Sequence, residues 1–276
     1  MPSLHRSVLL LGESNVGKTH FGAQLLKRLI VGRSSLRMNG QATNLEPFEQ
    51  AMERLADGCA TGHTPANVYE ESVWPVVDEH GQQAQLIWPD YGGEQIKNLI
   101  ADHRIAAPWR ERVNAATDWV LLVRLHILKG DADIFSRPLS DLGKTASVPL
   151  SQRPSDQARL IELLQMLLHI SPASRDKPIN LPSLTILLSC WDEVESKIEP
   201  HAALRSSLPM FCDFVESVWA QPVIMGLSAL ERPLAEDKSD QDYAIRGPEA
   251  FGYVVRPDGR SDPDITWPIT RLLAVA

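Results

Sequence analysis

Short apolar runs alternate along this chain with segments in which apolar residues recur at helical spacing. Nearly continuous apolar runs predict strands that are buried on both faces, as in a parallel sheet. Two further runs, Tyr69–Val77 and Ala84–Trp88, flank the polar stretch Asp78–Gln82 and predict a β-hairpin. The buried strands predicted in this way are Ser7–Leu11, Trp119–Leu125, Leu184–Ser189 and Pro222–Leu227.

The segments between these runs predict amphipathic helices, because their apolar residues fall on one helical face. Pro108 and Pro209 lie inside two of them and should interrupt the helix, since proline lacks an N–H and clashes with the preceding turn. The predicted helices are Thr19–Ile30, Glu46–Asp57, Gln95–Asn114, Asp156–Ile170, Ala202–Trp219 and Ile269–Val275.

Alternation of strands and helices predicts an α/β fold with three layers, in which helices cover both faces of a mostly parallel sheet. The hairpin supplies one antiparallel edge strand. Two polar stretches, about 127–153 and about 232–264, lack periodicity and are interpreted as insertions; a small hairpin is expected around Phe251–Val255. With no internal repeat and no linker, residues 1–276 are predicted to form a single domain.

The first predicted strand leads directly into Gly12–Thr19, which has the pattern GxxxxGK[ST] and precedes a predicted helix. Strand, glycine-rich loop and helix in this order are the context of a phosphate-binding P-loop. The loop amides and the helix N-terminus would face the phosphates, Lys18 would bridge the β- and γ-phosphates, and the Thr19 hydroxyl would hold Mg²⁺. The expected nucleotide contacts are Gly12, Ser14, Asn15, Val16, Gly17, Lys18, Thr19 and His20, although His20 is also explained by packing.

A second motif, Asp90–Gly93, ends the strand that follows the predicted hairpin. An aspartate at this position can hold Mg²⁺ through water, and the Gly93 N–H can sense the γ-phosphate. The next residues, Glu94 and Gln95, are the candidates for orienting the attacking water, together with a group supplied by a partner.

Two further strand ends carry candidates for reading the base. Asp192, after the strand Leu184–Ser189, can accept hydrogen bonds from N1–H and the N2 amine of guanine, a donor pair that adenine lacks. Ser228 and Ala229 follow the last core strand, where their backbone could contact the guanine O6. In the loop before the hairpin, Thr64 is the predicted Mg²⁺ ligand of the triphosphate state, with Thr61 as the alternative.

Composition narrows the choice of partner. The net charge of −8 disfavours nucleic acid and anionic membranes, but it does not disfavour a nucleotide held by local amides, one lysine and Mg²⁺. The three cysteines show no metal-ligand spacing and are interpreted as buried or half-buried thiols. Without a signal peptide or a membrane-spanning apolar run, the chain is expected to be cytoplasmic.

Taken together, these motifs resemble the translation-factor-related (TRAFAC) class of P-loop GTPases. In this chain the DxxG motif of that class has the form DxGG, and its NKxD motif is eroded to Ser189–Asp192. More narrowly, the phrases GESNVGKTHFGAQLL, SVWPVVDEHG and WPDYGGEQ resemble the bacterial double-GTPase family. The resemblance implies a Mg²⁺-dependent switch that hydrolyses GTP to GDP, in a conflict or stress-response system.

The chain departs from the TRAFAC pattern at two places. Ser189-Cys190 replaces the usual Asn-Lys pair, whose lysine stem packs over the base; Trp191 could stack there instead, although core packing explains it more simply. Glu94 stands where the water-positioning glutamine is expected, which predicts slow intrinsic hydrolysis.

The expected partner is a protein effector or regulator, with a second GTPase or a neighbouring-gene product as candidates, and a nucleotide-dependent dimer is left open. An arginine finger from Arg104, Arg110 or Arg112 is a further option beside a solvated helix face. Two rival functions remain, a P-loop ATPase and a non-hydrolysing module that nucleotide stabilises.

Overall fold

The computed structural model describes residues 6–32, 34–62, 70–90, 105, 107–128, 155–173, 176–194 and 198–274. Within these ranges, nine strands form one sheet in the order β2-β3-β4-β1-β5-β6-β7-β8-β9. The strands are β1 (Arg6–Gly12), β2 (Leu36–Met38), β3 (Glu70–Asp78), β4 (Gln83–Asp90), β5 (Asp118–Val123), β6 (Ser183–Ser189), β7 (Val223–Ser228), β8 (Tyr253–Val255) and β9 (Ser261–Asp262).

The centre of the sheet is parallel and both of its ends are antiparallel. Strands β4, β1, β5, β6 and β7 run parallel to one another. The predicted hairpin β3–β4 is present, and β2 adds a further antiparallel strand outside it. At the other end, β8 and β9 form a second antiparallel pair beside β7. The predicted α/β class with a mostly parallel sheet is therefore confirmed, and the antiparallel part is larger than the hairpin alone.

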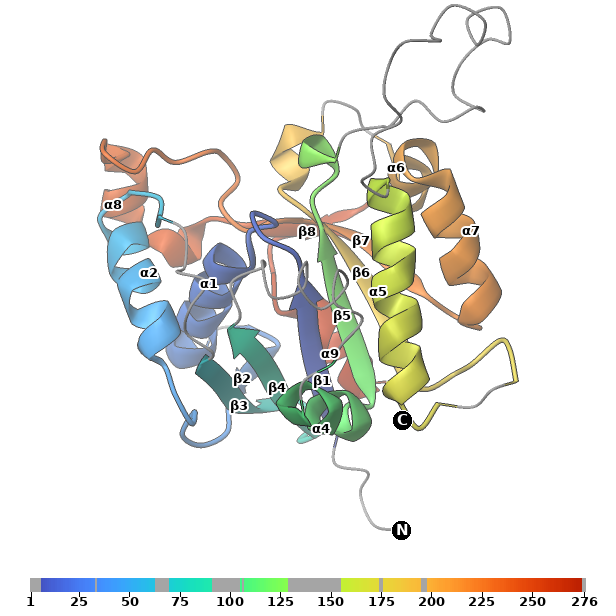
Figure 1. The fold of residues 1–276 in the computed structure, drawn as a ribbon. Helices are drawn as coiled ribbons and strands as arrows, with labels where there is room; N and C mark the ends of the chain where they lie inside the picture. Colours follow the sequence, from blue (N-terminus) through green and yellow to red (C-terminus); the bar gives the residue numbers. More distant parts are fainter. Residues whose placement is uncertain are drawn as a thin grey trace, which may run out of the picture.

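Helices cover the sheet on both faces, which gives the three predicted layers (Figure 1). One core contains side chains of α4, α5, α6 and α7, and the other contains those of α1, α2 and α9. Successive residues of β1 and β5 point into opposite cores, as the pleat requires. The helices are α1 (Lys18–Val31), α2 (Glu46–Ala56), α4 (Ala107–Ala115), α5 (Asp156–Ile170), α6 (Pro200–Ser207), α7 (Pro209–Val218), α8 (Gln241–Arg246) and α9 (Trp267–Ala274).

Pro209 separates two helices as predicted, and Pro108 lies at the start of a helix. The helix expected over Ala202–Trp219 is two helices, because Pro209 starts α7 one residue after Leu208. Pro108 lies in the first turn of α4, where no intrahelical N–H is needed. The part of the expected helix Gln95–Asn114 that precedes residue 105 lies outside the described residues.

The stretch expected as a second insertion supports the sheet. It contains α8 and the strands β8 and β9, and β8 pairs with β7 next to the core. The small hairpin expected near Phe251–Val255 is therefore present, with β9 as its second strand. Within the described ranges, none of the helices has the length and apolar character needed to cross a bilayer.

A buried carboxylate crosslinks three parallel strands at their amino ends. Asp118, at the start of β5, is 0% exposed and accepts hydrogen bonds from Ser183 on β6 (2.5 Å) and Arg6 on β1 (3.4 Å). A buried carboxylate stays charged at low cost only when such donors compensate it. Asp118 thereby fixes β1, β5 and β6 side by side, which sets the positions of the loops at their other ends.

Candidate functional site

The predicted site residues cluster because four parallel strands end at the same edge of the sheet. Strands β1, β5, β6 and β7 are successive neighbours. The loop Gly12–Lys18 follows β1, Arg124 follows β5, Cys190–Glu193 follows β6, and Ser228 ends β7. The chain leaves β1 toward β2–β4 on one side and returns as β5 on the other, and such a reversal of strand order is where α/β sheets bind ligands.

The loop after β1 closes around its own lysine. The Lys18 ammonium donates to the carbonyls of Gly12 (2.6 Å) and Glu13 (3.1 Å). Gly17 has a φ of 77° and Asn15 one of 66°, so both adopt the left-handed conformation that tightens the loop. A Cβ on Gly12 would lie 2.8 Å from Val16, which explains why the loop begins with glycine.

The N-terminus of α1 fits an anion. It has no side-chain cap, and its first turn contains no acidic residue. The N–H groups of the first turn and the positive end of the helix dipole therefore face the loop with no acidic side chain in that turn. A phosphate chain is the ligand that this combination of amides and lysine binds best.

The acidic residue of the loop, Glu13, is neutralised by an arginine of α5. Glu13 is 7% exposed and accepts two hydrogen bonds from Arg159 of α5, at 2.5 and 2.8 Å. The hydrogen bond to Glu13 is also the largest cause that raises the pKa of Arg159, and Asp156 adds to it. The pair removes a repulsive charge from the phosphate site and anchors the loop to α5.

Arg124 joins the loop after β1 to the loop after β6. Its guanidinium donates to the Asn15 carbonyl at 3.0 Å and forms a two-point ion pair with Glu193, with Nε 2.9 Å from the carboxylate. The hydrogen bond to Glu193 is the largest cause that raises the pKa of Arg124. Because β5 lies between β1 and β6, a side chain at its end reaches both neighbours.

The carboxylate expected to read the base is exposed and oriented. Ser228, 0% exposed, donates its hydroxyl hydrogen to Asp192 Oδ1 and accepts the N–H of Glu231 at 2.9 Å. The hydroxyl hydrogen can point in only one direction, so the Glu231 N–H directs it toward Asp192. Ser228 therefore positions Asp192. The carbonyl of the neighbouring Ala229 accepts a hydrogen bond from Gln24 of α1 at 3.0 Å.

Trp191 belongs to the core, which favours the packing interpretation over base stacking. It is 7% exposed and lies so close to β7 that a Cβ on Gly226 would be 2.5 Å from its ring. Cys190 has a φ of 51°, and burial raises the pKa of its thiol to about 11. The Ser189 hydroxyl is buried without a partner among the described residues. Among the described residues of this loop, 190–194, no side chain is a cation; Arg124 reaches the loop from the end of β5 through Glu193.

His20 connects α1 to the start of the segment expected to sense the γ-phosphate. The Thr61 N–H donates to His20 Nε2 at 3.2 Å, which requires an unprotonated nitrogen. Burial, and then the positive charge of Arg124, lower the pKa of His20, while Glu236 opposes them.

The same segment is braced from the other side. Ala60 donates to the Ala235 carbonyl at 2.9 Å, and Asp240 donates to the Gly58 carbonyl at 2.9 Å. Residues 58–61 are thereby held between α1 and the stretch 235–240 that follows β7.

Several predicted residues cannot be placed further. Gly93, Glu94, Gln95 and Thr64 lie outside the described residues. Asp90 ends β4 beside β1, at the same edge of the sheet, but its side chain is also outside them. Arg112 pairs with Glu71 of β3 at 2.5 Å, which gives it a structural role.

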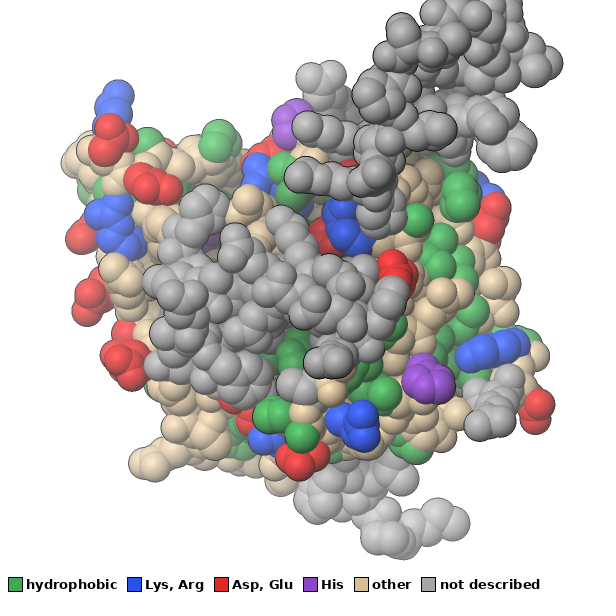
Figure 2. Space-filling view, viewed as in Figure 1, with side chains coloured by type: hydrophobic (Ala, Val, Ile, Leu, Met, Phe, Trp, Pro, Cys, Tyr) green, Lys and Arg blue, Asp and Glu red, His purple; other side chains and the backbone are tan. Residues whose placement is uncertain are grey.

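Sequence reasoning missed Arg124 and Arg159. The available signal was weak: Arg124 is a charged residue directly after a buried strand, and Arg159 lies one turn into a helix. On the face shown in Figure 2, basic and acidic side chains of the described residues are interspersed.

Comparison with known proteins identifies one family and shows similarity to solved structures. The model of the family described as Double-GTPase 1 matches residues 9–272. Among solved structures, the chain is similar to the S. cerevisiae Ski7 GTPase-like domain bound to GTP, at 13% identity and a TM-score of 0.41. That match covers 86% of this chain and 47% of the yeast chain, so this chain spans about half of its length. No curated protein matches.

The brace at Gly58 predicts a large effect of one methyl group. A Cβ on Gly58, where φ is 72°, would lie 2.3 Å from the Asp240 carbonyl oxygen, a backbone atom that cannot turn aside. We expect Gly58→Ala to lower the free energy of unfolding by about 2–5 kcal/mol. Gly81→Ala is the matched control, because its φ is 82° and nothing lies within 4 Å; it should cost only about 1–2 kcal/mol. Urea unfolding of both variants checks this, and equal losses would contradict the brace.

His20 predicts a dependence of stability on pH. Its folded-state pKa is lowered, so its contribution is present above the unfolded value of about 6.5 and is lost as the pH falls below it. His20→Gln offers an acceptor oxygen to the Thr61 N–H but cannot titrate. The free energy of unfolding of the native chain relative to this variant should therefore be higher at pH 8 than near pH 5.5. Denaturant unfolding measures this difference, and a difference between the native chain and His20→Gln that does not change with pH would refute a neutral His20 acceptor.

Proposed function

Because this chain belongs to the Double-GTPase 1 family, we propose that it is a guanine-nucleotide switch that hydrolyses GTP to GDP with Mg²⁺. The observation that carries the proposal is the pairing of an uncapped helix N-terminus with an oriented carboxylate at one edge of the sheet. The first fits the phosphates, the second fits the base, and Arg124 connects the loops that bear them.

The loop after β1 fits the phosphate part of the ligand. Lys18 now donates to two loop carbonyls, and it can exchange them for phosphate oxygens, which are stronger acceptors. The Thr19 hydroxyl at the start of α1 and the Asp90 carboxylate at the end of β4 are the oxygen donors that would hold Mg²⁺, directly and through water. When bound, the ion would neutralise charge that develops on the β- and γ-phosphates.

The base is selected by Asp192. A guanine would satisfy both carboxylate oxygens with N1–H and the N2 amine, whereas adenine would leave them unpaired. Ser228 already occupies one lone pair of Oδ1 and holds the carboxylate in one orientation, which lowers the entropy cost of binding. Cys190 cannot provide the cation that the TRAFAC pattern has at its position, so the Arg124 guanidinium takes over the link to the phosphate loop.

Hydrolysis would be slow in the isolated protein. Water attacks the γ-phosphate, Lys18 neutralises the developing charge, the Gly93 N–H senses the γ-phosphate, and Glu94, Gln95 or a partner's group orients the water. We propose that the nucleotide state is read by a protein partner through residues about 58–67 and 90–107. The segment begins at Gly58 and Ala60, where the stretch 235–240 braces it, and this provides a physical link between the base side and that surface.

Competition binding tests the base site. GTP, GDP and ATP compete against fluorescent GDP in Mg²⁺ on the native chain, Asp192→Asn and the control Asp258→Asn, an exposed turn residue. We expect a guanine preference of about 10²-fold or more that collapses in Asp192→Asn, because the amide presents a donor to guanine's donors. The control should retain it. Equal competition by ATP in the native chain would instead indicate an ATPase.

Turnover is measured separately as phosphate release. A GTPase releases phosphate from GTP in a manner that chelation of Mg²⁺ abolishes, and Lys18→Ala removes both binding and turnover. Tight binding and thermal stabilisation by GTP without any phosphate release would favour the non-hydrolysing module.

Removal of Arg124 should weaken binding of the whole nucleotide. We expect Arg124→Ala to lower the affinity for GDP by about 10–100-fold, which is equivalent to about 1.4–2.8 kcal/mol of binding free energy. The loss is expected because both loops lose the donor that they share. Arg124→Lys should recover only part of the loss, since a single ammonium cannot reproduce the fork between Asn15 and Glu193. Arg110→Ala, on the exposed face of α4, is the control and should bind normally. Native affinity in Arg124→Ala would contradict the bridging role.

A further inference from the structure

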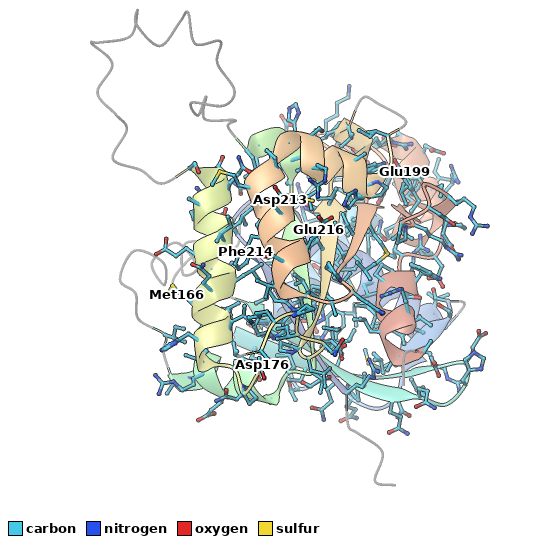
Figure 3. The ribbon with its side chains drawn as sticks, turned by 90° about the vertical axis from the view of Figure 1, so that its right-hand side faces the viewer. Met166, Asp176, Glu199, Asp213, Phe214 and Glu216 are labelled. Atoms are coloured by element: carbon cyan, nitrogen blue, oxygen red, sulfur yellow. The ribbon has the colours of Figure 1, made fainter. Side chains whose placement is uncertain are left out.

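A cluster of metal-ligating side chains lies on α6 and α7, outside the nucleotide site. His201 is the second residue of α6, while Cys212 and Glu216 lie one turn apart on the same face of α7. Their ligand atoms all lie within 4.8 Å of one another. We propose that these three side chains bind Zn²⁺ or a similar borderline divalent cation, with solvent as the fourth ligand. Figure 3 faces this side of the molecule and labels Asp213, Phe214 and Glu216 along α7.

The distances within the cluster suit a tetrahedral ion. Cys212 Sγ lies 3.9 Å from His201 Nε2 and 3.8 Å from Glu216 Oε1. For Zn–S of about 2.3 Å and Zn–N or Zn–O of about 2.0–2.1 Å, the ligand–ligand edges of a tetrahedron are roughly 3.3–3.6 Å. The edges to sulfur therefore already match within a few tenths of an ångström. The third edge, between His201 Nε2 and Glu216 Oε1, is a 2.5 Å hydrogen bond and must widen by roughly 0.8 Å.

Only small rotations are required to widen that edge. The side chains of His201 and Glu216 are 45% and 36% exposed, so both can turn without disturbing the core. Cys212, by contrast, is fully buried and fixed by the packing of α7. One rigid soft ligand and two adjustable ligands would let the site close around an ion and leave its outer position open to water.

The surrounding charges also suit a divalent cation. A thiolate and a carboxylate give the ligand set a charge of −2, which a Zn²⁺ ion neutralises. Arg205 binds the other oxygen of Glu216, Oε2 at 2.5 Å, and also Asp213 at 2.9 Å. Glu216 Oε1 remains directed at His201 and Cys212. A hydrogen-bonded partner such as Arg205 commonly orients a metal-ligating carboxylate in this way.

The ligand types select the metal. A thiolate and an imidazole favour Zn²⁺ or Co²⁺, whereas Mg²⁺ requires an oxygen cage. This cluster would therefore bind a different cation from the one expected beside Thr19. The linear sequence gave no metal motif because the ligands come from two helices that meet only after α7 has folded back on α6.

Cobalt spectroscopy tests the site on the full chain after removal of metals by a chelator. We expect one equivalent of Co²⁺ to produce the visible bands of a tetrahedral ion and a near-ultraviolet thiolate charge-transfer band, which Zn²⁺ abolishes and excess Mg²⁺ does not. Cys212→Ser should lose the charge-transfer band. His201→Gln, a change at a partly exposed residue, should weaken Co²⁺ binding by more than about tenfold.

Two controls exclude other causes. Cys59→Ser removes a buried thiol elsewhere, and Cys190→Ser removes the thiol near the phosphate loop; both should keep the Co²⁺ spectrum. Zn²⁺ should raise the melting temperature of the native chain but not that of His201→Gln. The proposal is overturned if stoichiometric Co²⁺ gives no tetrahedral spectrum. It also fails if His201→Gln, folded by circular dichroism, binds Co²⁺ as well as the native chain.

Discussion

The Arg124 guanidinium holds the two halves of the candidate site in one frame. It donates to the carbonyl of Asn15 in the phosphate loop and pairs with Glu193, the neighbour of Asp192. The proposed nucleotide would touch both loops at once, so its affinity would depend on their relative position. The cation sits at the end of β5, which alone lies between β1 and β6. Its counterpart at the opposite end of the same strand is Asp118, which ties β1, β5 and β6 together.

A second set of contacts extends this frame toward the surface expected to change with nucleotide state. Gln24 of α1 donates to Ala229 and to the Tyr243 hydroxyl, so the helix that begins at the phosphate loop also supports the loop after β7. Tyr243 stacks on Phe251 at 4.1 Å, and Arg232 lies over the same rings. From this platform the stretch 235–240 reaches Gly58 and Ala60. Packed and hydrogen-bonded groups therefore connect the loop after β7 to residues 58–61.

The proposed metal cluster shows how separate the two faces of the sheet are. It lies on α6 and α7, whereas α1, the stretch 235–240 and α8 are associated with the other face (Figure 1). A cation there would stabilise the α6–α7 pair without contacting the phosphate loop, so the proposed metal site and the proposed nucleotide site can be tested independently. Arg205 can keep its ion pair with Glu216 whether the other carboxylate oxygen is paired with His201 or bound to an ion.

The α/β class, the buried strands, the hairpin and the phosphate loop could all be predicted from the sequence. Each of these depends on local physics: the two-residue period of strands, the helical period, the missing N–H of proline and the backbone freedom of glycine. Because carboxyl ends of parallel strands share an edge, the sequence also located Lys18, Asp192 and Ser228 at one edge of the sheet. It missed β2 and α8, which are too short for any period to appear. Three contacts became visible only in the folded chain: Arg124 bridges two loops, Arg159 neutralises Glu13, and His20 accepts the Thr61 N–H. Those contacts follow from strand order and helix placement, which bring together residues far apart in the chain and which no local pattern encodes.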